Sequence, residues 1–74
     1  MGGDSDVSQL SDRELEIFRM MGRGRTTRGV SDDLGISVKT VQVYCGRMKR
    51  KLGIANGIQL VRQATLWWES QEQT

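Results

Sequence analysis

The sequence predicts an all-α fold made of four helices. The 74-residue chain contains no proline, the residue that most strongly interrupts helices. Apolar residues recur at spacings of three and four in separate segments, as expected for helices that each bury one face. A Ser, Thr or Asn precedes each segment as a candidate N-cap, and glycines end three of them. These signals place helices at residues 12–21, 27–34, 38–52 and 57–70.

The composition is typical of one small water-soluble domain. No apolar run approaches the roughly 18 residues needed to span a bilayer, so no membrane partner is expected. The lone Cys45 cannot form a disulfide within the chain, which favours a reducing cytoplasm. Residues 1–9 are mostly small, polar or acidic and are expected to form a flexible tail or linker. The domain itself is predicted over residues 10–74.

A capping box defines the start of the first helix. Ser11 and Glu14 have the S-x-x-E spacing in which each side chain accepts a hydrogen bond from the other's backbone N–H. Order is expected to begin at Leu10. The inward face is expected to carry three apolar residues at a spacing of three: Leu15, Phe18 and Met21.

Residues 31–41 carry the most specific local pattern. Gly35 can take a left-handed backbone that ends the second helix, and Ser37 can cap the third. Helices joined by so short a connection cross steeply, and Ser31 supplies a small residue for their closest approach. This order is typical of a helix-turn-helix, which points to DNA. The second helix is expected to turn three residues inward: Val30, Ser31 and Leu34.

The third and fourth helices each have an apolar stripe. In the third helix the stripe consists of Val41, Cys45, Met48 and Leu52. Asn56 can cap the fourth helix, whose apolar side consists of Leu60, Val61, Ala64, Trp67 and Trp68. Adjacent helical positions lie about 100° apart, so the two tryptophans cannot share one direction. One is expected to pack on Phe18 and Met21, and the other to serve a dimer or a further domain.

Basic residues concentrate in the middle of the chain. From Arg23 to Lys51 there are eight Lys or Arg and two Asp, a net charge of +6, whereas the remaining residues sum to −4. Such a basic segment indicates a nucleic-acid-binding face. The alternative interpretation is an ordinary solvated surface on an amphipathic bundle.

The outward side of the third helix carries the candidate DNA-contacting residues. With the apolar stripe buried, this side presents Lys39, Gln42, Val43, Gly46, Arg47 and Arg50. A helix fits the major groove, where Gln can pair with adenine through two hydrogen bonds and Val can pack on a thymine methyl. Phosphate contacts are expected from Lys and Arg near the helix ends and from the start of the second helix: Thr26, Thr27 and Arg28.

Catalytic and metal chemistry has little support in the sequence. The chain has no His, and its carboxylates are explained as caps and exposed helix charge. No enzymatic activity, cofactor or metal is therefore predicted. Residues 22–24 are interpreted as a turn rather than a phosphate-binding loop. Cys45 lies on an apolar stripe and is expected in the core rather than as a redox sensor.

In order and spacing, several segments resemble the LuxR-type (GerE-like) helix-turn-helix domain of bacterial transcription regulators. Residues 10–18, LSDRELEIF, are similar to the family's opening L-[ST]-x-R-E-x-E-[VI]-[LF]. Gly24 with Thr26 resembles its G-x-[ST]. Residues 34–41 resemble its L-x-[IL]-S-x-x-T-V core, and residues 51–54 its K-L-[GN]-[VI] junction.

The resemblance implies a four-helix domain that binds double-stranded DNA as a homodimer, with the third helix on DNA and the fourth at the dimer contact. By position, it implies base contacts by Gln42, Val43 and Gly46. It implies DNA-backbone contacts by Thr26, Thr27, Lys39, Thr40, Arg47 and Lys51. The chemistry and position of three further residues predict the same role for them: Arg28, Tyr44 and Arg50. Trp67 and Trp68 are candidates for a dimer or domain interface. Members of the NarL/FixJ response-regulator type carry a receiver before this domain, so an upstream receiver and RNA polymerase are further candidate partners.

The chain departs from the family pattern at four positions. Tyr44 replaces a common His but can still donate a hydrogen bond to phosphate, and Gly29 and Gly57 replace a usual Glu and Arg. Gly46 replaces a basic or polar residue and leaves the centre of the reading face bare. Two other functions stay open: a sigma-factor-like domain that contacts promoter DNA and RNA polymerase, and a protein-interaction module that has lost DNA binding. The junction at residues 51–53, followed by a full fourth helix, argues against the first of these.

Overall fold

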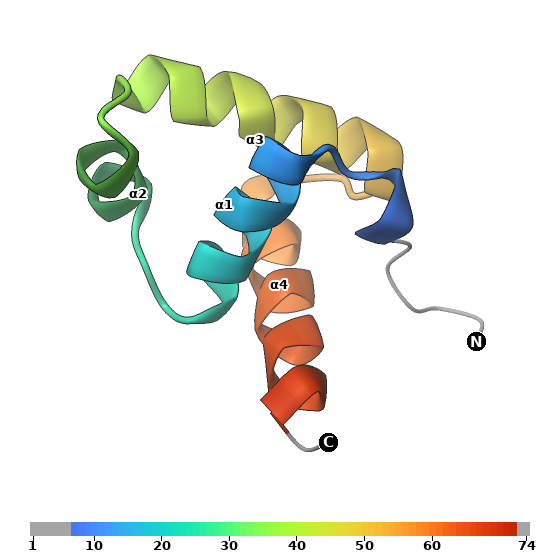
Figure 1. Ribbon diagram of the computed structural model, residues 1–74. Coiled ribbons are helices and arrows are strands. Elements are labelled where there is room, and N and C mark those ends of the chain that lie inside the picture. The colour runs from blue at the N-terminus through green and yellow to red at the C-terminus, as the bar shows by residue number, and fades with distance from the viewer. Residues whose placement is uncertain (1–6, 73–74) are drawn as a thin grey trace.

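The computed structural model describes residues 7–72 and has the predicted all-α architecture (Figure 1). One turn of 3-10 helix, η1 (Val7–Gln9), precedes α1 (Asp12–Gly22), α2 (Thr27–Leu34), α3 (Val38–Leu52) and α4 (Gly57–Glu72). These residues contain no strand. The prediction of four helices is therefore confirmed.

The helix bounds differ little from those predicted. α2 and α3 have the expected bounds, α1 ends one residue later at Gly22, and α4 continues two residues past the predicted end at residue 70. Order was expected to begin at Leu10, but η1 precedes it and packs against α3. The first six residues of the predicted tail lie outside the described residues, as do residues 73 and 74.

Each α-helix begins at the predicted cap. A backbone N–H three residues later donates to the cap's side-chain oxygen, at 3.2, 3.0, 3.0 and 2.9 Å for Ser11, Thr26, Ser37 and Asn56 respectively. Glu14 completes the capping box by accepting from the Ser11 backbone N–H at 2.9 Å. Gly35 and Gly53 end α2 and α3 at φ 68°, a left-handed conformation that favours glycine. Local interactions therefore account for where the helices start and stop.

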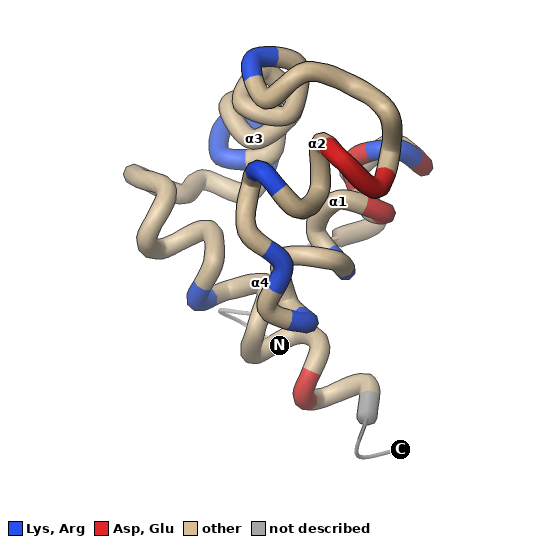
Figure 2. Tube along the Cα trace, turned by 90° about the vertical axis from the view of Figure 1, so that its left-hand side faces the viewer, with Lys and Arg blue, Asp and Glu red and all other residues tan. Residues whose placement is uncertain are grey.

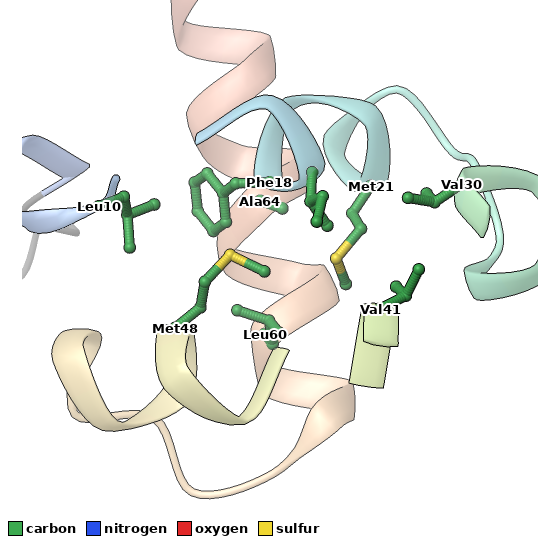
Figure 3. Packing of buried hydrophobic residues seen from close by; sticks show 9 residues of the cluster. Leu10, Phe18, Met21, Val30, Val41, Met48, Leu60 and Ala64 are labelled. Carbon is green, nitrogen blue, oxygen red and sulfur yellow. The ribbon is translucent and has the colours of Figure 1, made fainter. Parts of the chain in front are cut away.

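The helices pack around one core (Figure 3). α1 packs mainly on α4, and α2 packs mainly on α3 (Figure 1). The core is formed by nine buried hydrophobic residues: Leu10, Ile17, Phe18, Met21, Val30, Val41, Met48, Leu60 and Ala64. Trp67 adds a ring contact at the edge, with its centroid 5.6 Å from that of Phe18. One tryptophan therefore packs on Phe18, as predicted.

Three side chains lie differently from expectation. Ile17 is fully buried at the centre of α1, whereas Leu15, predicted to face inward, is half-buried beside the core. Phe18 and Met21 are buried as predicted, so the inward face of α1 includes Ile17 beside them and leaves Leu15 at its edge. Val61 is 46% exposed rather than inward, since the step of about 100° from Leu60 takes it to the outer edge of α4. Glu14 completes the capping box as predicted and is in addition buried, with 2% of its surface accessible.

Candidate nucleic-acid interface

The connection between α2 and α3 holds the two helices in a fixed relation. Gly35 N–H and Ile36 N–H donate back to the Asp32 and Ser31 carbonyls at 3.4 and 3.1 Å, which closes the end of α2. Ser31 is buried, and its hydroxyl donates to the Arg28 carbonyl at 2.8 Å. The small residue predicted for the helix crossing is therefore in the interior with its hydroxyl satisfied.

The outward face of α3 is open, as its sequence predicts. Six predicted contact residues are exposed: Lys39, Thr40, Gln42, Val43, Arg47 and Arg50. Val43, with 49% of its surface accessible, is an apolar side chain that packs on nothing in the core. At Gly46 an added Cβ would meet no atom within 4 Å. The bare centre of this face is therefore a property of the sequence, because no neighbour requires glycine there.

The start of α2 lies beside this face. Thr27 and Gln42 line the same open groove, of about 760 Å³, between α3 and the first turn of α4. Thr26 and Arg28 are exposed at the same helix start, where free N–H groups and the helix dipole favour anions. Figure 2 shows Lys and Arg along the chain entering α2 and on α3, with Asp on the second half of α2. The structure thus brings the predicted phosphate and base contacts together on neighbouring helices.

A bidentate ion pair fastens the loop before α2. Arg25 donates from Nε and Nη2 to the Asp33 carboxylate at 2.9 and 2.8 Å, and from Nη2 to the Gly29 carbonyl at 3.3 Å. A Cβ on Gly29 would come within 3.0 Å of the Arg25 guanidinium carbon. The glycine that departs from the family pattern therefore leaves room for Arg25 to lie across α2. Sequence reasoning missed this pair, because the two residues are eight positions apart with a turn between them.

The C-terminal end of α3 is tied to α1 by a second ion pair. Lys51 Nζ lies 2.7 Å from Glu14 Oε1, with the carboxylate buried and the lysine side chain 38% exposed. Burial alone would raise the pKa of Glu14, but hydrogen bonds from Lys51 and from Ser11, with the positive charge of Lys51, outweigh it. The pKa of Glu14 is consequently held below its ordinary value. Lys51, predicted as a phosphate contact, therefore already has a carboxylate partner.

The remaining cations and Tyr44 surround the outward face of α3. The Arg47 guanidinium carbon lies 5.6 Å from the centroid of the half-buried Tyr44 ring. Arg50 and Lys51 follow in the last turn of α3, where the helix dipole favours positive charge.

Cys45 packs beside the core, with its Sγ 4.0 Å from the Met21 Sδ. It is half-buried, and burial raises the pKa of its thiol. A raised pKa disfavours the reactive thiolate, in keeping with the predicted packing role.

Both tryptophans of α4 pack within the chain. Trp68 is half-buried and lies under the Arg23 guanidinium, 5.5 Å from the ring centroid. A Cβ on Gly22 would lie 2.5 Å from the Ala64 carbonyl oxygen and 2.8 Å from the Trp68 Cβ, so Gly22 permits the close approach of α1 and α4. The large apolar side chains that α4 leaves exposed are instead Ile58, Val61 and Leu66, at 83%, 46% and 54%. Sequence reasoning missed Ile58 and Leu66, although both fall opposite Leu60 and Ala64 on the helix.

Within residues 7–72, no helix combines the length and apolar character that a membrane crossing requires.

Comparison with known proteins agrees with this geometry. The chain is 38% identical over 63 residues to the transcriptional activator protein ExaE of Pseudomonas putida, covering 85% of this chain and 29% of that protein. It is 38% identical over 61 residues to the response regulator UvrY of Escherichia coli (strain K12), covering 82% and 28%. It is 30% identical over 59 residues to the transcriptional regulatory protein UhpA of the same strain, covering 80% and 30%.

The chain thus spans less than a third of the length of these relatives. No solved structure matches it. The family model GerE, described as bacterial regulatory proteins of the luxR family, matches residues 8–64. Helix order, caps and turn agree with that match, and the chain belongs to the luxR family of bacterial regulatory proteins.

Proposed function

We propose that this chain is the DNA-binding effector domain of a bacterial transcription regulator and that α3 enters the major groove of double-stranded DNA. The observation that carries the proposal is the outward face of α3, whose polar and apolar side chains are exposed beside a basic helix end. Gly35 ends α2 in a left-handed conformation, and the Ser37 side chain caps the start of α3. The family match does not favour the sigma-factor-like alternative.

Base reading is assigned to the middle of the exposed face. Gln42 can donate to and accept from adenine, and Val43 can pack on a thymine methyl. Gly46 adds no side chain but allows the α3 backbone to approach a base edge closely. An A·T-containing half-site is the expected target.

Backbone contacts are assigned to residues around that face. They are Thr26, Thr27 and Arg28 at the start of α2, and Lys39, Thr40, Arg47 and Arg50 on α3, with the Tyr44 ring beside Arg47. Lys51 is the remaining candidate, but its ammonium would have to leave the buried Glu14 carboxylate to reach a phosphate. We therefore place Lys51 last among the phosphate contacts.

The test is a salt series on duplexes selected from a random pool by the protein itself. Specific binding should weaken steeply with salt, with log K falling by about 0.9 per phosphate contact for each tenfold rise in salt. Random duplexes should bind more weakly than selected ones at every salt concentration. Absent or salt-insensitive binding would contradict the proposal and favour a protein-interaction module.

The whole protein is proposed to be a cytoplasmic response regulator with a receiver domain before this one. Support comes from the response regulator UvrY among its relatives and from the small share of their length that the chain spans. A DNA ligand is what supports the cytoplasmic location in this proposal. RNA polymerase is a further candidate partner, and copurification with the full-length regulator on promoter DNA would test it.

A homodimer through α4 is also proposed. Ile58, Val61 and Leu66 are the large apolar side chains that α4 exposes. Trp67 and Trp68 are further candidates, although Trp67 packs on Phe18 and Trp68 lies under Arg23. Sedimentation of the wild type should show a concentration-dependent dimer that Leu66→Glu abolishes. Gln71→Glu, exposed near the end of α4 and about 140° around the helix from Leu66, is the control for charge alone. A dimer that survives Leu66→Glu unchanged would contradict the α4 assignment.

A further inference from the structure

Arg47 is supported by the ring of Tyr44. The guanidinium carbon is 5.6 Å from the ring centroid, within the range of about 6 Å over which a cation is attracted to an aromatic face. Tyr44 itself packs against the hydrophobic core. The ring is therefore held by the core on one side and holds Arg47 on the other.

The two residues belong to one flank of α3. Thr40, Tyr44, Arg47 and Lys51 follow each other at spacings of four, three and four, which places them on one side of the helix, between the buried stripe and the outward face. Lys51 is engaged by Glu14. Arg47 has no carboxylate within ion-pair distance among the described residues. Arg47 is thus the cation of this flank that can turn to a phosphate without leaving a buried charge unpaired.

Ordering an exposed arginine on a ligand removes much of its rotamer freedom. A ring that already restricts the side chain lowers this cost at the moment of binding, which is the effect of preorganisation. The predicted role of Tyr44 was different: its hydroxyl was expected to donate to a phosphate. The contact with Arg47 gives the ring a role that does not need the hydroxyl.

We infer that Tyr44 is a positioning residue for Arg47: its ring holds the guanidinium ready for a DNA phosphate. The inference rests on the proposed function and concerns a position where this chain departs from its family. The inference predicts that DNA affinity depends on the Tyr44 ring and not on its hydroxyl. It also predicts that the loss of affinity on removing the ring requires Arg47 to be present.

The experiment measures affinity for a selected duplex across a salt series. Tyr44→Phe should bind within about twofold of the wild type, and Tyr44→Leu about two- to fivefold more weakly, the range of an exposed cation–π contact. Arg47→Gln should lower the salt slope by about 0.9, and Tyr44→Leu should add no further loss in that background. Lys39 is a matched exposed cation away from the ring. In a Lys39→Gln background, Tyr44→Leu should therefore keep its full effect on affinity. Thermal unfolding checks that each variant is folded.

A second readout uses the free protein. Ring-current shifts of the Arg47 side-chain protons should be present in the wild type and Tyr44→Phe and absent in Tyr44→Leu; their absence from the wild type would overturn the inference. Equal losses of affinity for Tyr44→Phe and Tyr44→Leu would transfer the role to the hydroxyl, and a full Tyr44→Leu effect without Arg47 would remove the coupling. Either result would overturn this inference while leaving the proposed function intact. A wild type that binds no duplex would overturn both.

Discussion

The two ends of α3 differ in what their side chains already contact. At the C-terminal end, the Lys51 ammonium holds the buried carboxylate of Glu14 from α1. At the N-terminal half, Gln42 and Val43 are exposed, and within residues 7–72 the Gln42 side chain has no hydrogen-bond partner. One end contributes a cation that is already paired inside the protein, whereas the other presents an amide side chain that is available to a ligand.

The two ends of α3 are therefore expected to serve different purposes: the C-terminal end stabilises the fold, and the N-terminal half contacts DNA bases. Removing a partner from a buried pair leaves a desolvated charge, so the C-terminal end should be sensitive in folding experiments. Exposed side chains contribute little to stability. The N-terminal half should therefore be sensitive in binding experiments.

Removing Lys51 is the largest expected perturbation of the fold. Lys51→Met should lower the free energy of unfolding by about 1.5–3 kcal/mol, because Glu14 would lose its charged hydrogen bond while remaining buried. Urea unfolding measures this. Arg50→Met, one position earlier and exposed, should change stability by no more than about 0.5 kcal/mol. Equal effects of the two substitutions would show that the ion pair does not anchor α3.

Removing Gln42 tests the opposite end. Gln42→Ala should reduce discrimination between A·T and other pairs at one position of the site by about 1–3 kcal/mol. Stability should change little, since the side chain is exposed. Competition with singly substituted duplexes gives the discrimination, and urea unfolding gives the control. An unchanged base preference at every position of the site would show that Gln42 does not contribute to base recognition.

Adding a side chain at Gly46, in the centre of the outward face of α3, is expected to raise stability, by less than the loss of Lys51 lowers it. Gly46→Ala should raise the free energy of unfolding by up to about 1 kcal/mol, because Ala is the better helix former and its Cβ meets nothing within 4 Å. If the backbone approaches a base there, the same variant should bind the selected duplex more weakly. Stabilisation with unchanged affinity would show that this backbone does not approach DNA closely.

Protonation of Glu14 gives the mildest perturbation. Because its pKa is lower folded than unfolded, the pair stabilises the protein fully above the unfolded pKa. That stabilisation is lost as pH falls through the folded value. The free energy of unfolding should therefore decline as the pH falls below the ordinary pKa of a glutamate, which an acid titration of stability measures. Glu14→Gln should show a weaker decline over the same range. Parallel curves would mean that other carboxylates dominate.

Much of the local structure could be predicted from residues close together in the chain. The capping box joins Ser11 to Glu14 three positions on, and the cap at Ser37 likewise joins it to Thr40. Gly35 ends α2 through its own backbone conformation. Such interactions need no knowledge of how helices pack, so the helix bounds and the exposed face of α3 followed from the sequence.

Contacts between distant elements required the tertiary structure. Lys51 and Glu14 are 37 positions apart, and their pairing depends on the rotation of α1 against α3. The same rotation buries Ile17 in preference to Leu15. A helix pattern permits several inward faces that differ by one step of about 100°, and only packing selects among them.

By itself, the sequence determined the four helices, their caps and the side of α3 that carries Gln42 and Val43, because these depend on neighbours within one or two turns. The tertiary structure decided which charged groups are already paired. It ties Lys51 to Glu14 and Arg25 to Asp33, and leaves Arg47 on the ring of Tyr44. A side chain's availability to DNA depends on what lies across from it, and that is set by how the helices pack.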